Sequence, residues 1–293
     1  ALFFAIGLDE CVSRFSRILN LEFRITNGSL AHWLIGSFFL LAWFVPFAYT
    51  LPAYARPALL SEGDVQRISR PFQSTFADQI QLLGYDLEAR SIKPGETLRV
   101  TLYWRALASM PESYRMFVHL VGQGDRIAGG ADVIPARGAF PTVYWKPGDT
   151  LRDVVPIVVA ENAQPGKYAI EIGLYPVGKP GERLTVSPSG DDRVIIDALK
   201  VASRENRAFN PHTRVDANFS DKIELSGYDA AIDQNTLHLA LYWRARTAID
   251  DDYSVFVHVL DANGKIVAQA DRPPQAGNYP TSIWDSGEQV RDD

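Results

Sequence analysis

A five-residue motif, Leu-Tyr-Trp-Arg-Ala, occurs twice in this chain, at residues 102–106 and again at residues 241–245. When residues 101–153 are laid over residues 240–292 without a gap, 20 of the 53 positions are identical. Self-similarity at a fixed offset is the sequence signature of a duplicated structural unit. The chain therefore contains two copies of one module, and its fold must accommodate the motif twice.

The repeated segment alternates apolar and polar residues with a period of two. Leu98, Val100, Leu102 and Trp104 alternate with polar or aromatic neighbours, and residues 168–174 alternate in the same way. This period is typical of half-buried β-strands. Further short runs at 80–90, 114–121, 126–133, 150–160 and 193–201 are separated by turn signals. We therefore predict an all-β fold of tandem antiparallel β-sandwiches, Ig-like or jelly-roll-like.

The two copies differ in length. The first copy continues beyond Asp153 as far as Val201, whereas the sequence ends one residue after the matching Asp292. At the other end, the chain opens on an apolar octet without Met or the basic start of a signal peptide. We therefore expect the second sandwich to be truncated and the chain to be an internal piece of a longer protein.

Residues 25–55 carry no charged side chain. The stretch from Leu30 to Leu51 would span roughly 33 Å as a helix, about the thickness of a bilayer core. We predict a transmembrane helix over this stretch; the alternative is a buried core helix. Arginines flank it on both sides, which leaves its orientation open. The predicted divisions are a membrane-proximal amphipathic segment (1–29), the transmembrane helix (30–54), a connector (55–70), the first sandwich (71–202), a linker (203–214) and the second sandwich (215–293).

Composition and motifs exclude several classes of function. A net charge of −6 without a Lys/Arg-rich run argues against a nucleic-acid partner. No Walker loop, Gly-x-Ser-x-Gly, His-Glu-x-x-His or Cys/His cluster is present, so we predict no catalytic residue, cofactor or metal. The acidic run 250–252 lacks the spacing of a calcium loop, which favours a solvated turn. Cys11 is the only cysteine.

Polar and aromatic residues recur at matched positions in the two copies. One interpretation is a sugar-binding platform; the other is a core Trp with an Arg or His paired to the repeated Asp. Because both copies carry the same set, we favour structural roles, since an unpaired buried charge is costly. This repeat signature comprises Trp104, Arg105, His119 and Asp132, with Trp243, Arg244, His258 and Asp271 as their counterparts.

A second group of candidates lies in the long loop that precedes each Arg-Asp pair. We expect its aromatic residues to be exposed and to contact a ligand; the alternative is that they cap the edge of the sandwich. These candidates are Phe140, Tyr144 and Trp145 in the first copy, with Tyr279 and Trp284 in the second.

Several motifs taken together resemble a known family. They include Pro-Ala-Tyr-Ala at 52–55, Gly-Tyr-Asp at 84–86, Pro-Gly-Glu-Thr-Leu at 94–98, the repeated Leu-Tyr-Trp-Arg-Ala and Phe-Val-His-Leu at 117–120. Residues 30–293 resemble the C-terminal region of multi-spanning bacterial membrane glycosyltransferases of the protein mannosyltransferase and aminoarabinose transferase type, in a Chloroflexota-like form. The copies depart from each other at Phe140 and Tyr279, and at Gly129-Gly130 and Ala268-Gln269.

The resemblance implies a noncatalytic extracytoplasmic tail of an enzyme that uses a lipid-linked sugar donor. In such enzymes the catalytic carboxylate lies in an early loop, which this sequence does not include. The implied partners are the lipid bilayer of the cytoplasmic (inner) membrane and a glycan or lipid-linked sugar acceptor. The alternative is a membrane-anchored cell-surface binding or adhesion protein without enzyme activity. A glycoside hydrolase is disfavoured, because the sequence places no two carboxylates opposite each other.

Overall fold

The computed structural model describes residues 28–45, 48, 56–204 and 208–293. The chain divides into two compact units, residues 1–55 and residues 56–293. Strands make up about half of the second unit and helices very little of it, which agrees with the predicted all-β class. The predicted amphipathic segment lies almost entirely outside the described residues.

The first unit contains helix α2 (Gly28–Val45). It covers the first part of the predicted transmembrane helix (30–54), whose residues 46–47 and 49–54 lie outside the described residues. The described side chains in its second half include exposed apolar residues such as Phe38 and Leu40. Within the described ranges, no helix combines the length and the apolar character needed to cross a membrane.

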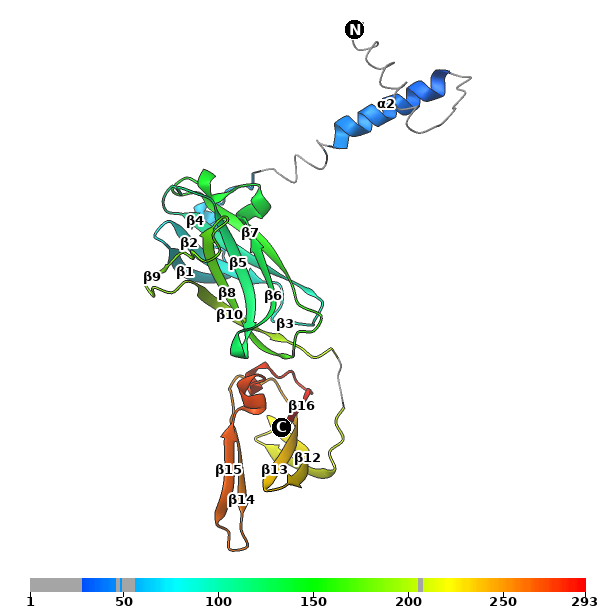
Figure 1. Cartoon of the computed structure of the whole chain (residues 1–293), viewed down its shortest axis with the longest axis vertical. Helices are drawn as coiled ribbons and strands as arrows, with labels where there is room; N and C mark the ends of the chain where they lie inside the picture. The colour runs from blue at the N-terminus through cyan, green and yellow to red at the C-terminus, as the bar shows by residue number, and fades with distance from the viewer. Residues whose placement is uncertain (1–27, 46–47, 49–55, 205–207) are drawn as a thin grey trace. The chain divides into compact units, whose positions relative to one another are not determined.

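The second unit begins with the short helix α4 (Glu62–Val65), which Ser61 caps, and continues into a sandwich of two five-stranded sheets. In Figure 1 the two sheets form facing layers. All neighbouring strands are antiparallel except β10 and β3. The first sheet has the order β7-β4-β2-β1-β9, with β1 (Arg70–Phe76), β2 (Ile80–Leu87), β4 (Thr97–Ala106), β7 (Thr150–Val158) and β9 (Val186–Ser187). The second has the order β3-β10-β8-β5-β6, with β3 (Ser91–Ile92), β5 (Tyr114–Gly122), β6 (Arg126–Val133), β8 (Gly166–Pro176) and β10 (Val194–Val201).

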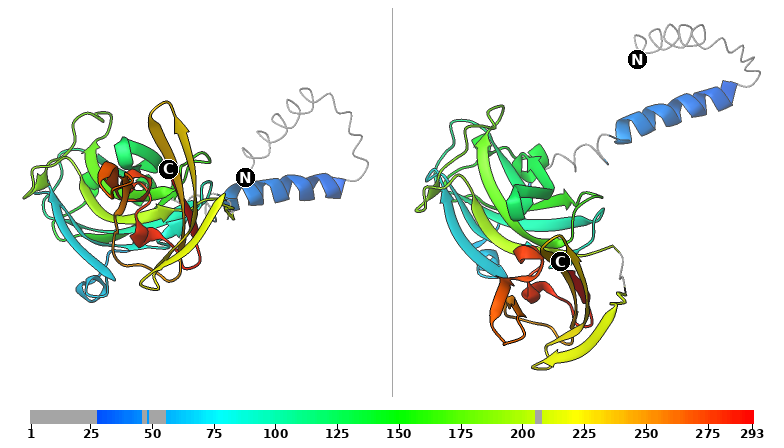
Figure 2. Two further views of the ribbon diagram at one scale, coloured as in Figure 1. Left: turned by 90° about the horizontal axis from the view of Figure 1, so that it is seen from below. Right: turned by 60° about the horizontal axis from the view of Figure 1, so that its bottom comes forward.

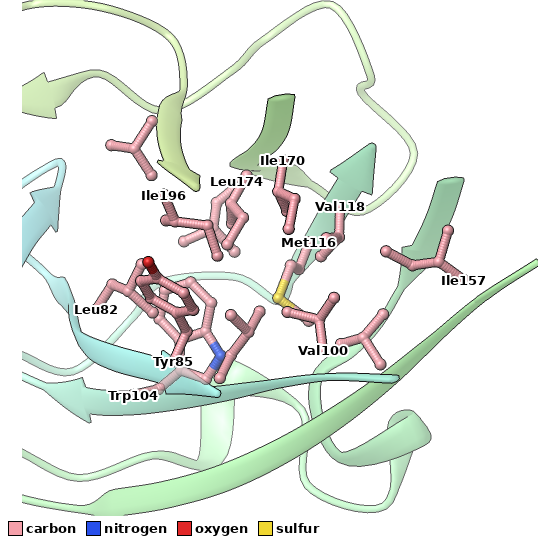
Figure 3. Close-up of a cluster of buried hydrophobic side chains, with 14 of the residues drawn as sticks. Leu82, Tyr85, Val100, Trp104, Met116, Val118, Ile157, Ile170, Leu174 and Ile196 are labelled. Carbon is pink, nitrogen blue, oxygen red and sulfur yellow. The ribbon is translucent and has the colours of Figure 1, made fainter. Parts of the chain in front are cut away.

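The core of this first module lies between its two sheets. Leu82 and Trp104 from the first sheet pack among Met116, Val118 and Leu174 from the second (Figure 3). The side chains of a strand point alternately to its two faces, so the period-two pattern delivers every second residue to this layer. Trp104 is only 1% exposed.

The second module repeats part of this arrangement. Its four-stranded sheet has the order β11-β12-β13-β16, which matches β1-β2-β4-β7, and a separate hairpin of β14 and β15 matches β5 and β6. Figure 2 shows this module from two further directions. The strands are β11 (Thr213–Phe219), β12 (Ile223–Asp233), β13 (Thr236–Ala245), β14 (Val255–Leu260), β15 (Ile266–Arg272) and β16 (Gln289–Asp292).

The Gly-Tyr-Asp motif has a steric role at the same point in both modules. Strand pairing shifts by one residue next to Gly84 in β2 and next to Gly227 in β12. A Cβ atom on Gly84 would lie 2.5 Å from the carbonyl oxygen of Arg70, and one on Gly227 would lie even closer to that of Thr213. Glycine is therefore required where the neighbouring backbone approaches.

The same motif is joined to the Tyr-Trp motif by a hydrogen bond. The Tyr103 hydroxyl donates to Asp86 over 2.7 Å, and the Tyr242 hydroxyl donates to Asp229 over the same distance. In the second module, the backbone N–H of His212 and the Tyr242 hydroxyl lower the pKa of Asp229 to about 2. The Gly-Tyr-Asp and Tyr-Trp motifs therefore form one structural contact, which occurs once in each module.

Candidate functional site

The repeated tryptophans lie in the two cores. Trp104 packs against Phe76 with ring centroids 5.9 Å apart, and Trp243 packs against Phe219 at 6.0 Å. Trp243 is 8% exposed. The enclosed ring of Trp104 presents no open face to a sugar arriving from solvent. The structure therefore places both tryptophans in packing positions.

The repeated arginines do not pair with the repeated aspartates. Arg105 contacts Glu62 over 2.7 Å and donates from Nε to the Thr150 hydroxyl over 3.2 Å. Arg244 lies exposed in β13. Of the two predicted partners for the repeated Asp, the histidine is the one that the structure brings to it.

His119 and Asp132 form the centre of a polar cluster on the outer face of the second sheet. The Nε2 atom of His119 lies 2.9 Å from Oδ1 of Asp132. The Tyr175 hydroxyl lies 3.3 Å from the other carboxylate oxygen, and the Phe117 ring lies 5.0 Å from the His119 ring. We call Phe117, His119, Asp132 and Tyr175 the outer-face cluster.

Burial differs across the outer-face cluster. Phe117 is 2% exposed, whereas the side chains of His119 and Asp132 are 22% and 45% exposed. Burial, and after it the negative charge of Asp132, raise the pKa of Tyr175. The cluster thus offers solvent an imidazole and a carboxylate set against buried rings. These groups donate and accept hydrogen bonds, as recognition of hydroxyl groups requires.

Two glycines make room for the rings of the outer-face cluster. A Cβ atom on Gly130 would lie 2.5 Å from the His119 ring, and a Cβ atom on Gly173 would collide with the Phe117 ring. The His119 ring therefore lies over Gly130 of β6, and the Phe117 ring lies over Gly173 of β8. Arg183 covers Phe117, with its Cζ atom 4.6 Å from the ring centroid.

The second module carries the same side chains in a looser arrangement. The Phe256 and His258 rings lie 5.3 Å apart, and His258 lies 3.9 Å from Asp271. Phe256 is 71% exposed. Among the described residues, no strand pairs with β14 in the way that β8 pairs with β5. The matched set is therefore present twice but compact only in the first module.

The predicted exposure of the loop aromatics is wrong for four of the five residues. Phe140, Trp145, Tyr279 and Trp284 are each at most 4% exposed, whereas Tyr144 is 66% exposed. Each tryptophan donates from Nε1 to a backbone oxygen five residues earlier, Trp145 to Phe140 and Trp284 to Tyr279. These bonds fold the loop back over the end of the sandwich, as the capping alternative requires.

Sequence reasoning missed the structural role of the repeated Arg-Asp pair. Asp153 accepts the N–H of Ala136 over 3.0 Å, and Asp292 accepts the N–H of Gln275 over 2.7 Å. Both acceptors are 4% exposed, and burial raises the pKa of each carboxyl group. The loop residues they hold have left-handed backbone angles, with φ of 54° at Ala136 and 48° at Gln275. The recurrence of the pair was the available signal.

The acidic run 250–252 lies in a turn of the second module. Asp251 lies 3.6 Å from Lys222, and Asp252 accepts the N–H of Ser282 over 3.1 Å. Across the described ranges, no group of three or more His, Cys, Asp or Glu side chains could hold a metal ion.

No family model matches the sequence, and no curated protein matches it. Among solved structures, the chain is similar to the C-terminal domain of Wzt, with 9% identity and a TM-score of 0.34 over 54% of this chain and 87% of that one. It is also similar to Spo0M, a sporulation control protein from Bacillus subtilis, with 8% identity and a TM-score of 0.24 over 69% and 91%. These similarities fit a β-rich domain and carry no argument about function.

Proposed function

We propose that the two modules are noncatalytic binding domains in the extracytoplasmic C-terminal region of an integral membrane glycosyltransferase that uses a lipid-linked sugar donor. In this role they hold an acceptor or a glycan near a reaction centre located elsewhere in the protein. Such domains contribute orientation to the reaction and no reacting group. The motif resemblance supports the assignment to this class.

The outer-face cluster carries the binding part of the proposal. Most of the repeated residues are used by the fold itself: Trp104 packs in the core, Tyr103 binds Asp86, and Trp145 closes its loop. His119 and Asp132 differ, because they lie outside the core and remain partly exposed. They recur at His258 and Asp271. A repeated polar pair that the core does not need is the best candidate for contact with a ligand.

Sugars fit the chemistry of this cluster. A carboxylate accepts hydrogen bonds from two neighbouring hydroxyl groups, and an imidazole held by that carboxylate offers its other nitrogen to a third. Arg115 donates to the backbone oxygen of Asp132 over 3.3 Å, which keeps a cationic group beside the pair. We therefore propose a glycan or a lipid-linked sugar acceptor as the ligand.

The membrane part of the proposal rests on the uncharged residues 25–55 and on the motif resemblance. We propose that residues 30–54 anchor the chain in the cytoplasmic membrane and that the modules lie outside it. Ser189 is exposed in the turn between β9 and β10. In a Cys11→Ser background, Ser189→Cys is expected to react with a membrane-impermeant thiol reagent on intact cells whose outer envelope has been removed. Reaction only after lysis would place the modules in the cytoplasm.

The binding role is tested with the whole chain in lipid nanodiscs and an array of bacterial glycans. We expect His119→Ala and Asp132→Asn to weaken glycan binding about tenfold, the usual result of losing one hydrogen bond to a charged group. His212→Ala is the matched control, because His212 also lies 2.9 Å from an aspartate but its side chain is 90% exposed. Absence of binding by the wild type, or equal weakening in the control, would refute the glycan-binding role.

An adhesion protein without enzyme activity would use the same cluster. The complete reading frame separates the two functions. Several further membrane spans with an acidic residue in the first outward loop support the glycosyltransferase, whereas a single anchor supports adhesion.

A further inference from the structure

The loop before β7 and its counterpart before β16 each form a small site for a cation. The site contains an aromatic ring and a carboxylate at matched positions, Phe140 with Asp149 in the first module and Tyr279 with Glu288 in the second. We call these sites the first and second sockets. In each case the cation precedes the module in the chain: Arg56 lies ahead of the first module, and Lys200 lies in β10 of the first module, ahead of the second.

The first socket holds Arg56. Its Nη2 atom lies 3.3 Å from Oδ2 of Asp149, and its Cζ atom lies 4.1 Å from the centroid of the Phe140 ring. Asp149 also accepts the N–H of Lys146 over 2.9 Å, which fixes the carboxylate. Four residues after Arg56, the N–H of Leu60 donates to the backbone oxygen of Thr150 over 2.8 Å. The segment leading into the first module is therefore held along the end of β7.

The second socket holds Lys200, which lies near the end of β10. Its Nζ atom lies 2.5 Å from Glu288, 2.7 Å from Asp285 and 5.3 Å from the Tyr279 ring centroid. Glu288 accepts the N–H of Asp285 over 2.7 Å, as Asp149 accepts that of Lys146. Lys200 is 4% exposed, although it belongs to the outer end of the first module.

The two sockets differ in the way that their cations differ. A guanidinium group is planar and packs well over an aromatic face, which suits Arg56 above Phe140. An ammonium group is a compact charge with three donors, and two carboxylates suit it better. The second carboxylate, Asp285, stands at the position of Lys146 in the first socket. The replacement of Lys146 by Asp285 thus matches the change of the cation from an arginine in the first socket to a lysine in the second.

Further contacts join the second socket loop to the first module. The Asn278 side chain donates to the Pro165 oxygen over 3.0 Å and accepts from Arg126 over 2.6 Å, and its backbone oxygen accepts the N–H of Lys167 over 3.0 Å. A Cβ atom on Gly166 would lie 2.9 Å from the Asn278 side chain. The surface around Lys200 therefore fits this loop closely.

We propose that each socket is a docking site for a cation that precedes its module in the chain, and that the second socket fixes the second module to the first. Residues 56–293 then form a coupled pair with Lys200 as the central contact. The partner of each socket is a cationic side chain of the same chain. This inference stands independently of the proposed glycan ligand.

Pulsed electron paramagnetic resonance on the whole chain tests the second socket. Spin labels at Ser189→Cys and Asn263→Cys, in a Cys11→Ser background, report one distance between the modules. We expect a narrow distribution in the otherwise unchanged chain and at least a twofold broader one in Lys200→Met. Asp285→Lys, which gives the second socket the residue of the first, is expected to broaden it as well, because like charges repel. The matched control is Lys222→Met. It removes the ion pair between Lys222 and Asp251, which are 3.6 Å apart and both lie in the second module.

Circular dichroism and the chemical-shift dispersion of isotope-labelled NMR spectra check that each variant is folded. Lys200→Met is the decisive variant, because it leaves the second module unaltered. The proposal is overturned if Lys200→Met keeps the narrow distribution, if the unchanged chain is already broad, or if Lys222→Met broadens it equally.

Hydrogen exchange tests the first socket in the same chain. In Arg56→Met, we expect exchange at the Leu60 N–H to become about tenfold faster, because the segment loses its anchor. Arg67→Met is the control, since within the described part of the chain the ion pair of Arg67 is a local one, with Asp64 at 3.8 Å. Unchanged exchange at Leu60 would remove the first socket from the proposal.

Discussion

The two modules place identical residues in different surroundings. Phe117 and Phe256 occupy matched positions, yet the first is 2% exposed and the second is 71% exposed. In the first module β8 and β10 complete the second sheet, whereas the described residues give β14 only β15 as a neighbour. The repeat therefore specifies the local backbone, while burial depends on strands elsewhere in the chain.

The cores differ in the same way. The first core draws buried residues from both of its sheets, including Trp104 and Met116. The second core draws them from one sheet and the neighbouring loops, with Trp243 and Trp284 at its centre. Trp243 also lines an apolar groove together with Leu225 and Phe256. One tryptophan is therefore enclosed and the other faces a groove.

Replacing each tryptophan by alanine is the strongest test of this difference. We expect Trp104→Ala to cost about 3–5 kcal/mol, because an enclosed aromatic leaves a cavity. Trp243→Ala is expected to cost about 1.5–3 kcal/mol, the transfer contribution alone, because the groove already admits solvent. Hydrogen exchange, read in β4 for Trp104→Ala and in β13 for Trp243→Ala, measures the loss in free energy of unfolding of each module. Equal losses would mean that the groove is closed in solution and that the two cores are equivalent.

Alanine at the two motif glycines tests the feature that the modules share. We expect Gly84→Ala and Gly227→Ala to destabilise their own modules by similar amounts, about 1–3 kcal/mol, because each new Cβ atom would overlap a backbone oxygen. Gly63→Ala in α4 is the control, since its Cβ atom would meet only the Ser61 hydroxyl oxygen at 3.7 Å. A loss of stability confined to one module would show that the one-residue shift in strand pairing has different roles in the two copies.

The sequence predicted the strands better than it predicted the site. Alternation around Trp104 identified β4, because a strand's period determines which side chains face the core. It did not identify the exposure of Phe140 or Tyr279, because their loops turn at left-handed residues such as Ala136 that no period reveals. The sockets were also missed. Arg56 and Asp149 are 93 residues apart, and only the folded chain brings them together.

Replacing the repeated buried carboxyl groups, Asp153 and Asp292, by asparagine is expected to give the smallest difference in stability between the modules. Asparagine keeps the hydrogen-bond acceptor and the packing. Burial raises the pKa of Asp153 and of Asp292 above the ordinary value of 3.8. A raised pKa means that the folded state holds the proton more tightly. The resulting stabilisation is complete below pH 3.8 and is lost as the pH rises through the folded-state pKa.

We therefore expect Asp153→Asn to gain stability relative to the wild type as the pH rises from below 3.8 to neutrality. Asp292→Asn should change in the same direction but less, because Asp292 lines a groove that solvent reaches. Urea unfolding of the whole chain at a series of pH values, read in β7 and β16 by hydrogen exchange, measures both differences. Asparagine keeps an oxygen acceptor for the N–H of Ala136 or Gln275, so a loss that does not vary with pH reports the hydrogen bond and not the charge. A larger pH-dependent gain in Asp292→Asn would contradict the comparison, because it would show the carboxyl group of the second module to be the more deeply enclosed of the two.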